Sequence, residues 1–133
     1  MLVVDASVLV VALTDDGVDG DRARLRLRGE RLGLPELADL EVASVLRRLL
    51  VAAKVDARRA RLALNDLRSL PAARAPHLPL LERAWQLRDN VTIYDGVYVA
   101  LAEALGAVLL TGDERLARAP VVRCPVEVLS ASA

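Results

Sequence analysis

The stretch MLVVDASVLV, residues 1–10, places one carboxylate, Asp5, inside an otherwise largely apolar run. A short apolar run is typical of a strand buried in the core of a protein. Burial of an ionised carboxylate is costly unless a cation or hydrogen-bond donors accompany it. Asp5 is therefore either a turn acid before a helix that Ser7 caps, or part of a site that takes up a cation.

The composition of the whole chain fits one folded domain, residues 1–133. Apolar residues make up 54% of the sequence, a surplus that favours strands buried on both faces or a surface covered by a partner. Basic and acidic residues balance at 18 each, so no global electric field would hold a nucleic acid. Any binding of a nucleic acid must therefore come from a local patch of charge.

The sequence predicts a protein of the cytoplasm without a membrane anchor. No run of uninterrupted apolar residues approaches the 18 that suggest a membrane span, and the first residues lack the basic region of a signal peptide. Cys124 is the only cysteine, which excludes an internal disulfide and suits a reducing compartment.

Apolar periodicity and turn residues divide the chain into strands and helices. The expected strands cover residues 2–4, 32–35, 107–111 and 121–129. The expected helices cover residues 7–13, 23–32, 36–54, 55–70, 78–90, 94–106 and 113–119, and a turn-rich loop is expected over residues 14–21. Strands separated by helices of this length indicate an α/β protein with a parallel sheet covered on both faces.

Three further acids fall where solvation is expected to be poor. Asp113 follows an apolar strand just as Asp5 does, and the ends of neighbouring parallel strands form the crevice where ligands bind. Glu41 lies in the apolar stripe of a long helix, and Asp95 opens another helix among mostly apolar neighbours. The sequence thus predicts four acids in apolar settings.

Each of these acids also has a local interpretation. Asp113 is placed to cap the helix that follows it, and Thr111 begins a capping-box spacing that ends at Glu114. Asp95 ends a capping-box spacing of its own. For Glu41, in mid-helix, the alternative is a buried ion pair with an arginine. A single shared site explains all four positions at once, and is the preferred hypothesis.

Such a site needs positive charge. Two carboxylates about 5 Å apart repel each other by roughly 3 kcal/mol at an effective dielectric constant near 20. A cluster of four either raises the pKa values of its members or binds a hard dication. Oxygen ligands without histidine or cysteine favour Mg²⁺, with Mn²⁺ as a substitute, over Zn²⁺. A water held by such an ion can attack a phosphodiester.

Three stretches of the sequence resemble the PIN-domain family, and within it the VapC-type toxins of toxin–antitoxin pairs. They are VVDASVLV at the start, PELADLEVASVLRR in the first third and TIYDGVYVALAEALGAVLLTGDERLA near the end. The resemblance implies a PIN-like three-layer α/β/α sandwich with a central, mostly parallel sheet. It also implies a Mg²⁺-dependent endoribonuclease, in which a water activated by the metal leaves a 5′-phosphate and a 3′-hydroxyl.

The resemblance assigns roles to residues of this chain. The catalytic and metal-binding acids of the family fall on Asp5, Glu41, Asp95 and Asp113. Two hydroxyls of the family fall on Ser7 and Thr111, which would orient a ligand or a water. Helix capping remains an alternative role for both hydroxyls.

The resemblance also implies partners: an RNA substrate, a second copy of the chain in a homodimer, and a VapB-like antitoxin that occupies the active-site groove. One side of the expected helix 23–32 carries three arginines at helical spacing, Arg24, Arg28 and Arg31. They form either a solvated face or a surface that contacts RNA phosphates or an acidic antitoxin segment.

Two other functions stay open at this point. A catalytically silent PIN domain would act only as a binding or regulatory partner. A receiver-type phosphoacceptor domain would need paired acids after the first strand and a late lysine, but Ala6 and Ser7 follow Asp5, and Lys54 lies elsewhere. The complete set of four acids favours the nuclease.

Overall fold

The computed structural model describes residues 1–130, and its strands form one five-stranded sheet. The strands are β1 (Leu2–Val4), β2 (Leu32–Pro35), β3 (Ala72–Ala75), β4 (Val108–Thr111) and β5 (Val126–Val128). They lie in the order β3-β2-β1-β4-β5, and all neighbouring pairs are parallel. The predicted α/β class with a parallel central sheet is confirmed.

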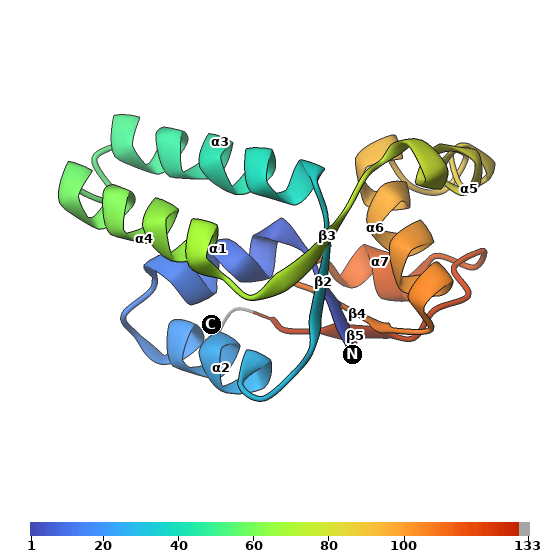
Figure 1. Cartoon of the computed structure of the whole chain (residues 1–133), viewed down its shortest axis with the longest axis horizontal. Helices are drawn as coiled ribbons and strands as arrows, with labels where there is room; N and C mark the ends of the chain where they lie inside the picture. Colours follow the sequence, from blue (N-terminus) through green and yellow to red (C-terminus); the bar gives the residue numbers. More distant parts are fainter. Residues whose placement is uncertain (131–133) are drawn as a thin grey trace.

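Helices cover both faces of this sheet. They are α1 (Ala6–Thr14), α2 (Val18–Leu27), α3 (Leu37–Val51), α4 (Ala57–Ser69), α5 (Leu81–Gln86), α6 (Ile93–Leu105) and α7 (Glu114–Arg118), with a 3₁₀ turn, η1 (Leu78–Leu80), before α5. Figure 1 shows α1 to α4 on one side of the strands and α5 to α7 on the other. The predicted three-layer α/β/α sandwich is therefore also confirmed.

The central strand, β1, is apolar because both of its faces and both of its edges are covered. None of its three residues, Leu2–Val4, is more than 2% exposed, and the strand pairs with β2 on one edge and β4 on the other. The chain runs outward from β1 to β2 and β3, then returns to form β4 and β5 on the opposite side. The carboxyl ends of β1 and β4 therefore flank the point of reversal, where open α/β sheets bind their ligands.

The second helix lies elsewhere than predicted. Helix α2 begins at Val18, inside the stretch predicted as a loop, and its first turn contains two acids that suit the positive end of the helix dipole. It ends at Leu27, because Arg28 has extended backbone and Gly29 adopts a φ of +76°. Arg28 and Arg31 thus lie beyond the helix, and the predicted helical face that they would share with Arg24 does not form.

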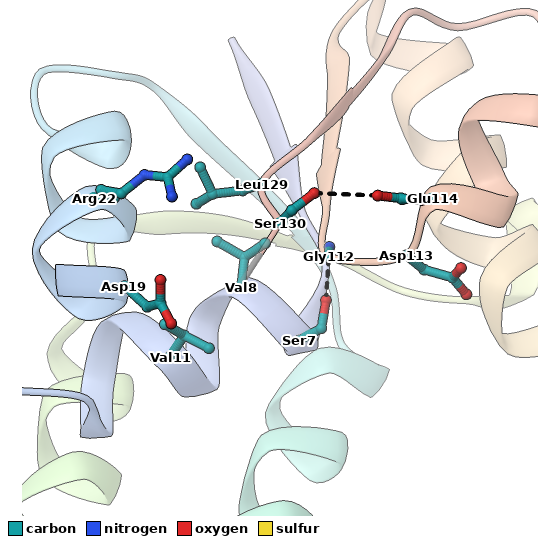
Figure 2. Close-up of a pocket in the computed structure, with 10 residues that line it drawn as sticks. All are labelled: Ser7, Val8, Val11, Asp19, Arg22, Gly112, Asp113, Glu114, Leu129 and Ser130. Atoms are coloured by element: carbon teal, nitrogen blue, oxygen red, sulfur yellow. Dashed lines mark hydrogen bonds between the residues drawn. The ribbon is translucent and has the colours of Figure 1, made fainter. Parts of the chain in front are cut away.

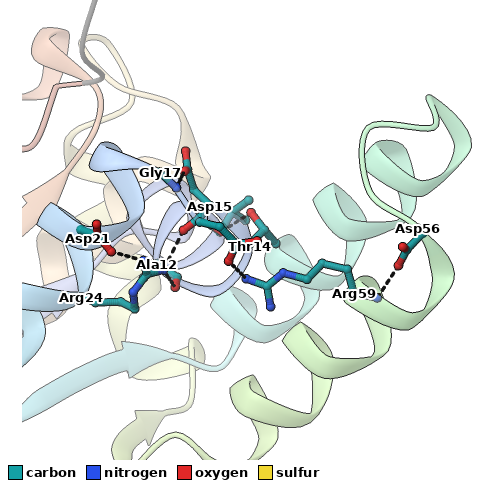
Figure 3. A network of polar contacts seen from close by, with 10 residues as sticks. Ala12, Thr14, Asp15, Gly17, Asp21, Arg24, Asp56 and Arg59 are labelled. Atoms are coloured by element: carbon teal, nitrogen blue, oxygen red, sulfur yellow. Dashed lines mark hydrogen bonds and ion pairs between the residues drawn. The ribbon is translucent and has the colours of Figure 1, made fainter.

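Arg24 instead joins α2 to the end of α1 (Figure 3). Its Nη1 donates hydrogen bonds to the carbonyl oxygens of Ala12, at 2.9 Å, and Asp15, at 2.7 Å, and its Nη2 donates to Asp21. The carbonyls at a helix C-terminus have no partner within the helix, so these bonds satisfy groups that would otherwise be unpaired. The donors of Arg24 are therefore used within the fold.

Two elements near the middle of the chain also differ from prediction. The short edge strand β3 (Ala72–Ala75) was not predicted, because its sequence, AARA, lacks an apolar strand pattern; it forms by pairing with β2. The helix predicted over residues 78–90 is shorter, since α5 ends at Gln86. Within residues 1–130, no helix has the length and apolar character that crossing a membrane requires.

Gly20 packs tightly against the C-terminal end of α1. A Cβ at this position would lie 1.8 Å from the carbonyl oxygen of Asp15, so the side chain of alanine would force α1 and α2 apart. We expect Gly20→Ala to lower the free energy of unfolding by roughly 1–3 kcal/mol, measured by chemical denaturation. Gly17→Ala is the control, because its Cβ would meet only a flexible side-chain oxygen of Asp15, at 3.1 Å. Equal stability of the two variants would contradict this account of the packing.

Candidate functional site

The four predicted acids lie along the carboxyl edge of the sheet. Asp5 directly follows β1 and Asp113 stands between β4 and α7, while Glu41 lies in α3 and Asp95 in the first turn of α6. All four side chains are partly buried. The topology thus brings to one edge of the sheet acids that are far apart in the sequence.

Asp5 is held by two hydroxyl groups. Its Oδ2 accepts hydrogen bonds from the Oγ of Ser7 and from the Oγ1 of Thr111, both at 2.8 Å. Asp5 occupies the N-cap position of α1, but its side chain makes no capping hydrogen bond there. The interpretation of Asp5 as a simple turn acid before a helix capped by Ser7 is therefore wrong.

The same two hydroxyls connect Asp5 to the turn between β4 and α7. The Oγ of Ser7 accepts a hydrogen bond from the N–H of Gly112 at 3.1 Å (Figure 2), and the Oγ1 of Thr111 accepts one from the N–H of Asp113 at 3.1 Å. Thr111 is fully buried. Neither hydroxyl caps a helix; both link the segments after β1 and β4.

Glu41 is paired with a tyrosine. Its Oε1 accepts a hydrogen bond of 2.7 Å from the hydroxyl of Tyr98, which is 1% exposed. Burial raises the pKa of Glu41, and the nearby charges of Asp5 and Asp95 raise it further, although the hydrogen bond opposes them. Among the ion pairs within residues 1–130, none involves Glu41. The alternative of a buried ion pair with an arginine is therefore wrong.

Tyr98 was not among the residues predicted to form the site. The available signal was its spacing from Asp95, since residues three apart on a helix share a face. Burial, followed by the hydrogen bond to Glu41, raises the pKa of the Tyr98 hydroxyl, which therefore remains a proton donor.

Asp95 takes part in helix capping through its backbone N–H, and its carboxylate also interacts with the capping residue, Thr92. Thr92 is the N-cap residue of α6, and its side chain accepts a hydrogen bond from the N–H of Asp95 at 3.1 Å. Burial raises the pKa of the Asp95 carboxyl group, and the charges of Asp5 and Asp113 add to this effect. Asp95 thus couples electrostatically to both strand-end acids.

Asp113 has a different environment, because Arg115 covers its carboxylate. Oδ1 accepts hydrogen bonds from the backbone N–H and the Nε of Arg115, at 2.9 and 3.1 Å, and Oδ2 accepts one from its Nη2 at 3.0 Å. These bonds lower the pKa of Asp113. The alternative of Asp113 as a helix cap is thereby confirmed, and its carboxylate points away from Ser7 (Figure 2).

The four acids form a coupled group, but not a ready-made cage. Within residues 1–130, no three acidic, histidine or cysteine side chains lie close enough together to hold a metal ion. The raised pKa values of Glu41 and Asp95 nevertheless reflect burial and negative charge that the nearby residues do not balance. A donor set made only of oxygen atoms fits a hard dication such as Mg²⁺ or Mn²⁺.

A hollow of about 380 Å³ lies beside the acids. Apolar side chains of Val8, Val11 and Leu129 line it, together with Ser7 and, on α2, Arg22 (Figure 2). Asp113 also lines the hollow, which therefore adjoins the acidic group. The site is therefore open on this side to a ligand larger than an ion.

The unbalanced charge predicts that Asp95→Asn stabilises the metal-free protein. A raised pKa means that folding disfavours the ionised form of Asp95. The carboxylate therefore destabilises the folded protein at pH values above its pKa in the folded state, and this destabilisation disappears as the pH falls below the ordinary pKa of an aspartate. At pH 7 with EDTA we expect the melting temperature to rise by roughly 2–5 °C. Asp66→Asn, which changes an exposed acid of α4, is the control. An equal effect of the two variants, or a gain that persists at pH 3, would contradict this prediction.

Comparison with known proteins agrees with this architecture. The PIN-domain family model matches residues 2–122. Ribonuclease VapC9 of Mycobacterium tuberculosis is 44% identical to this chain over 129 residues, which cover 97% of this chain and 98% of that protein. Ribonuclease VapC1 of the same organism is 44% identical over 128 residues, which cover 96% of each chain. A toxin–antitoxin complex from Klebsiella pneumoniae has the same fold, with a TM-score of 0.68, 16% identity and coverage of 99% of this chain and 100% of that one. This chain belongs to the PIN-domain family and, within it, to the VapC group.

Proposed function

We propose that this protein is a Mg²⁺-dependent endoribonuclease, a VapC-type toxin that hydrolyses RNA phosphodiester bonds. The observation that carries the proposal is the environment of Asp5, whose carboxylate is held by Ser7 and Thr111 from two different segments. Asp5 also raises the pKa values of Glu41 and Asp95, so the acids behave as one group. The relatives named ribonucleases, at 44% identity, support the same activity.

The proposed ligands of Mg²⁺, or of Mn²⁺ in its place, are the carboxylates of Asp5, Glu41, Asp95 and Asp113. A dication bound there would acidify a water molecule and offset negative charge on the phosphate. The charge of the site favours this, because a cation would offset the burial and the mutual repulsion that raise the pKa values of Glu41 and Asp95.

The protein's own contribution is to orient these groups. Two donated hydrogen bonds fix Oδ2 of Asp5, and therefore the plane of its carboxylate, which is the role that hydroxyls beside metal ligands usually have. Tyr98 does the same for Glu41, and its hydroxyl is itself buried. Ser7 and Thr111 are therefore proposed as positioning residues, and Tyr98 joins them.

We also propose an antitoxin as a partner, in line with the toxin–antitoxin complex that shares this fold. A groove of about 310 Å³ between α3 and α4 is lined by alanines, by Leu46, Leu50 and Leu64, and by two arginines, Arg47 and Arg61. Such a groove fits the apolar face of an amphipathic segment. Contacts of Arg28 and Arg31 with RNA or with an acidic antitoxin segment remain a prediction; both side chains are exposed.

A homodimer in the cytoplasm completes the proposal. Three exposed apolar side chains lie along η1 and α5: Leu78 (72% exposed), Leu81 (40%) and Trp85 (58%). Their spacing places them on the same side of this segment. Exposed apolar patches mark interaction surfaces in soluble proteins. The single free cysteine, Cys124, is compatible with a reducing compartment.

Cleavage of RNA by the purified protein is the direct test. Total cellular RNA incubated with Mg²⁺ should give fragments with 5′-phosphate and 3′-hydroxyl ends, and EDTA should prevent their formation. Asp5→Asn should reduce the rate by at least about 100-fold, because the loss of a direct ligand exceeds the effect of a lost outer hydrogen bond. Asp66→Asn should cut at the wild-type rate. Full activity of Asp5→Asn would refute the proposed mechanism.

Binding of the metal can be tested without RNA. Mg²⁺ at ten times its dissociation constant should stabilise the wild-type protein by about 1.4 kcal/mol, seen as a rise in melting temperature. Potassium chloride at matched ionic strength provides the control for screening. The rise should be much smaller for Asp5→Asn, and an equal rise in both proteins would mean that the ion binds elsewhere.

A further inference from the structure

Arg115 makes three hydrogen bonds to the carboxylate of Asp113, yet its side chain is 85% exposed. Its backbone N–H and Nε reach Oδ1, and its Nη2 reaches Oδ2. Within residues 1–130, this is the one ion pair that includes a member of the acidic group.

The guanidinium also acts on more than its direct partner. The charge of Asp95 contributes to raising the pKa of Arg115, and Arg115 in turn lowers that of Asp95. The charge of Arg115 is therefore felt by a second acid of the group as well as by Asp113. It is the one positive charge that the described residues place in an ion pair with this group.

We propose that Arg115 is a displaceable counter-ion that holds Asp113 in the metal-free protein, yields it to the dication, and then binds a phosphate of the RNA. The inference rests on the proposed function and deepens it. It assigns two successive partners to one side chain, a carboxylate and a phosphate, and makes Arg115 a substrate-binding residue of the same site.

The chemistry of the pair allows this exchange. An ion pair at an exposed position contributes little to stability, so a dication can replace the guanidinium at low cost. Carboxylate and phosphate present similar pairs of oxygens, and the planar fork of an arginine binds both in the same way. Arg115 stands in the first turn of α7, so the released side chain stays beside the acids.

If Arg115 exchanges partners in this way, its removal should strengthen the binding of the metal and weaken the binding of RNA. Arg115→Ala removes the two hydrogen bonds from the guanidinium to Asp113 and leaves only the one from the backbone N–H, so the variant should bind Mn²⁺ about two- to fivefold more tightly in the absence of RNA. The same variant should bind RNA more weakly, with a KM about three- to tenfold higher. A role in stability alone would produce neither effect.

The experiment measures the Mn²⁺ dissociation constant by electron paramagnetic resonance, and the kcat and KM of RNA cleavage, for each variant. Arg118→Ala is the matched control, since it removes the same charge from an exposed position of the same helix but makes no hydrogen bond to Asp113. Arg115→Lys keeps the charge without the fork and should recover metal affinity towards the wild-type value but not the KM. Circular dichroism verifies that each variant is folded.

The outcomes separate this inference from the function on which it rests. Tighter Mn²⁺ binding with a higher KM in Arg115→Ala, but not in Arg118→Ala, supports the exchange. Unchanged Mn²⁺ affinity in Arg115→Ala, or equal changes in both alanine variants, overturns it while leaving a working nuclease. A wild-type protein that neither binds Mn²⁺ nor cleaves RNA overturns the proposed function, and the inference with it.

Discussion

The hydrogen bond from the buried hydroxyl of Thr111 to Asp5 is the contact on which the rest of the site depends. It joins residues 106 positions apart and crosses from β4 to the end of β1. Its geometry needs the parallel pairing of these two strands, which in turn needs apolar residues throughout β1. The core and the acidic group are thus not separable features, because the strands that form the core also align the polar groups at their ends.

The fold could be predicted largely from local patterns, and the errors in that prediction have local causes. The strands β1, β2 and β4 and the helix α6 follow from apolar runs and from the helix-ending Gly106, which adopts the left-handed conformation. The edge strand β3 could not be predicted in this way, because partner β2 and not its own composition makes AARA a strand. The start of α2 was missed because TDDGVDGD has the composition of a turn, although packing of Gly20 against Asp15 favours the helix.

The sequence indicated the acids but not the groups that hold them. Position relative to strand ends and helix faces was enough to single out the four carboxylates and the two hydroxyls. It could not reveal that Tyr98 donates to Glu41, because that contact joins α6 to α3 across the molecule. Nor could it reveal that Asp113 is paired with Arg115, because helix capping alone accounts for an aspartate at this position.

The separation of Asp5 and Thr111 along the chain has a consequence during protein synthesis. When the ribosome has released only the segment up to α5, Asp5 has no contact with Thr111, and the central strand lacks one of its two neighbours. The carboxylates can assemble only once β4 has emerged from the ribosome. A product that stops before β4 would therefore lack the contact between Asp5 and Thr111 that orients the site.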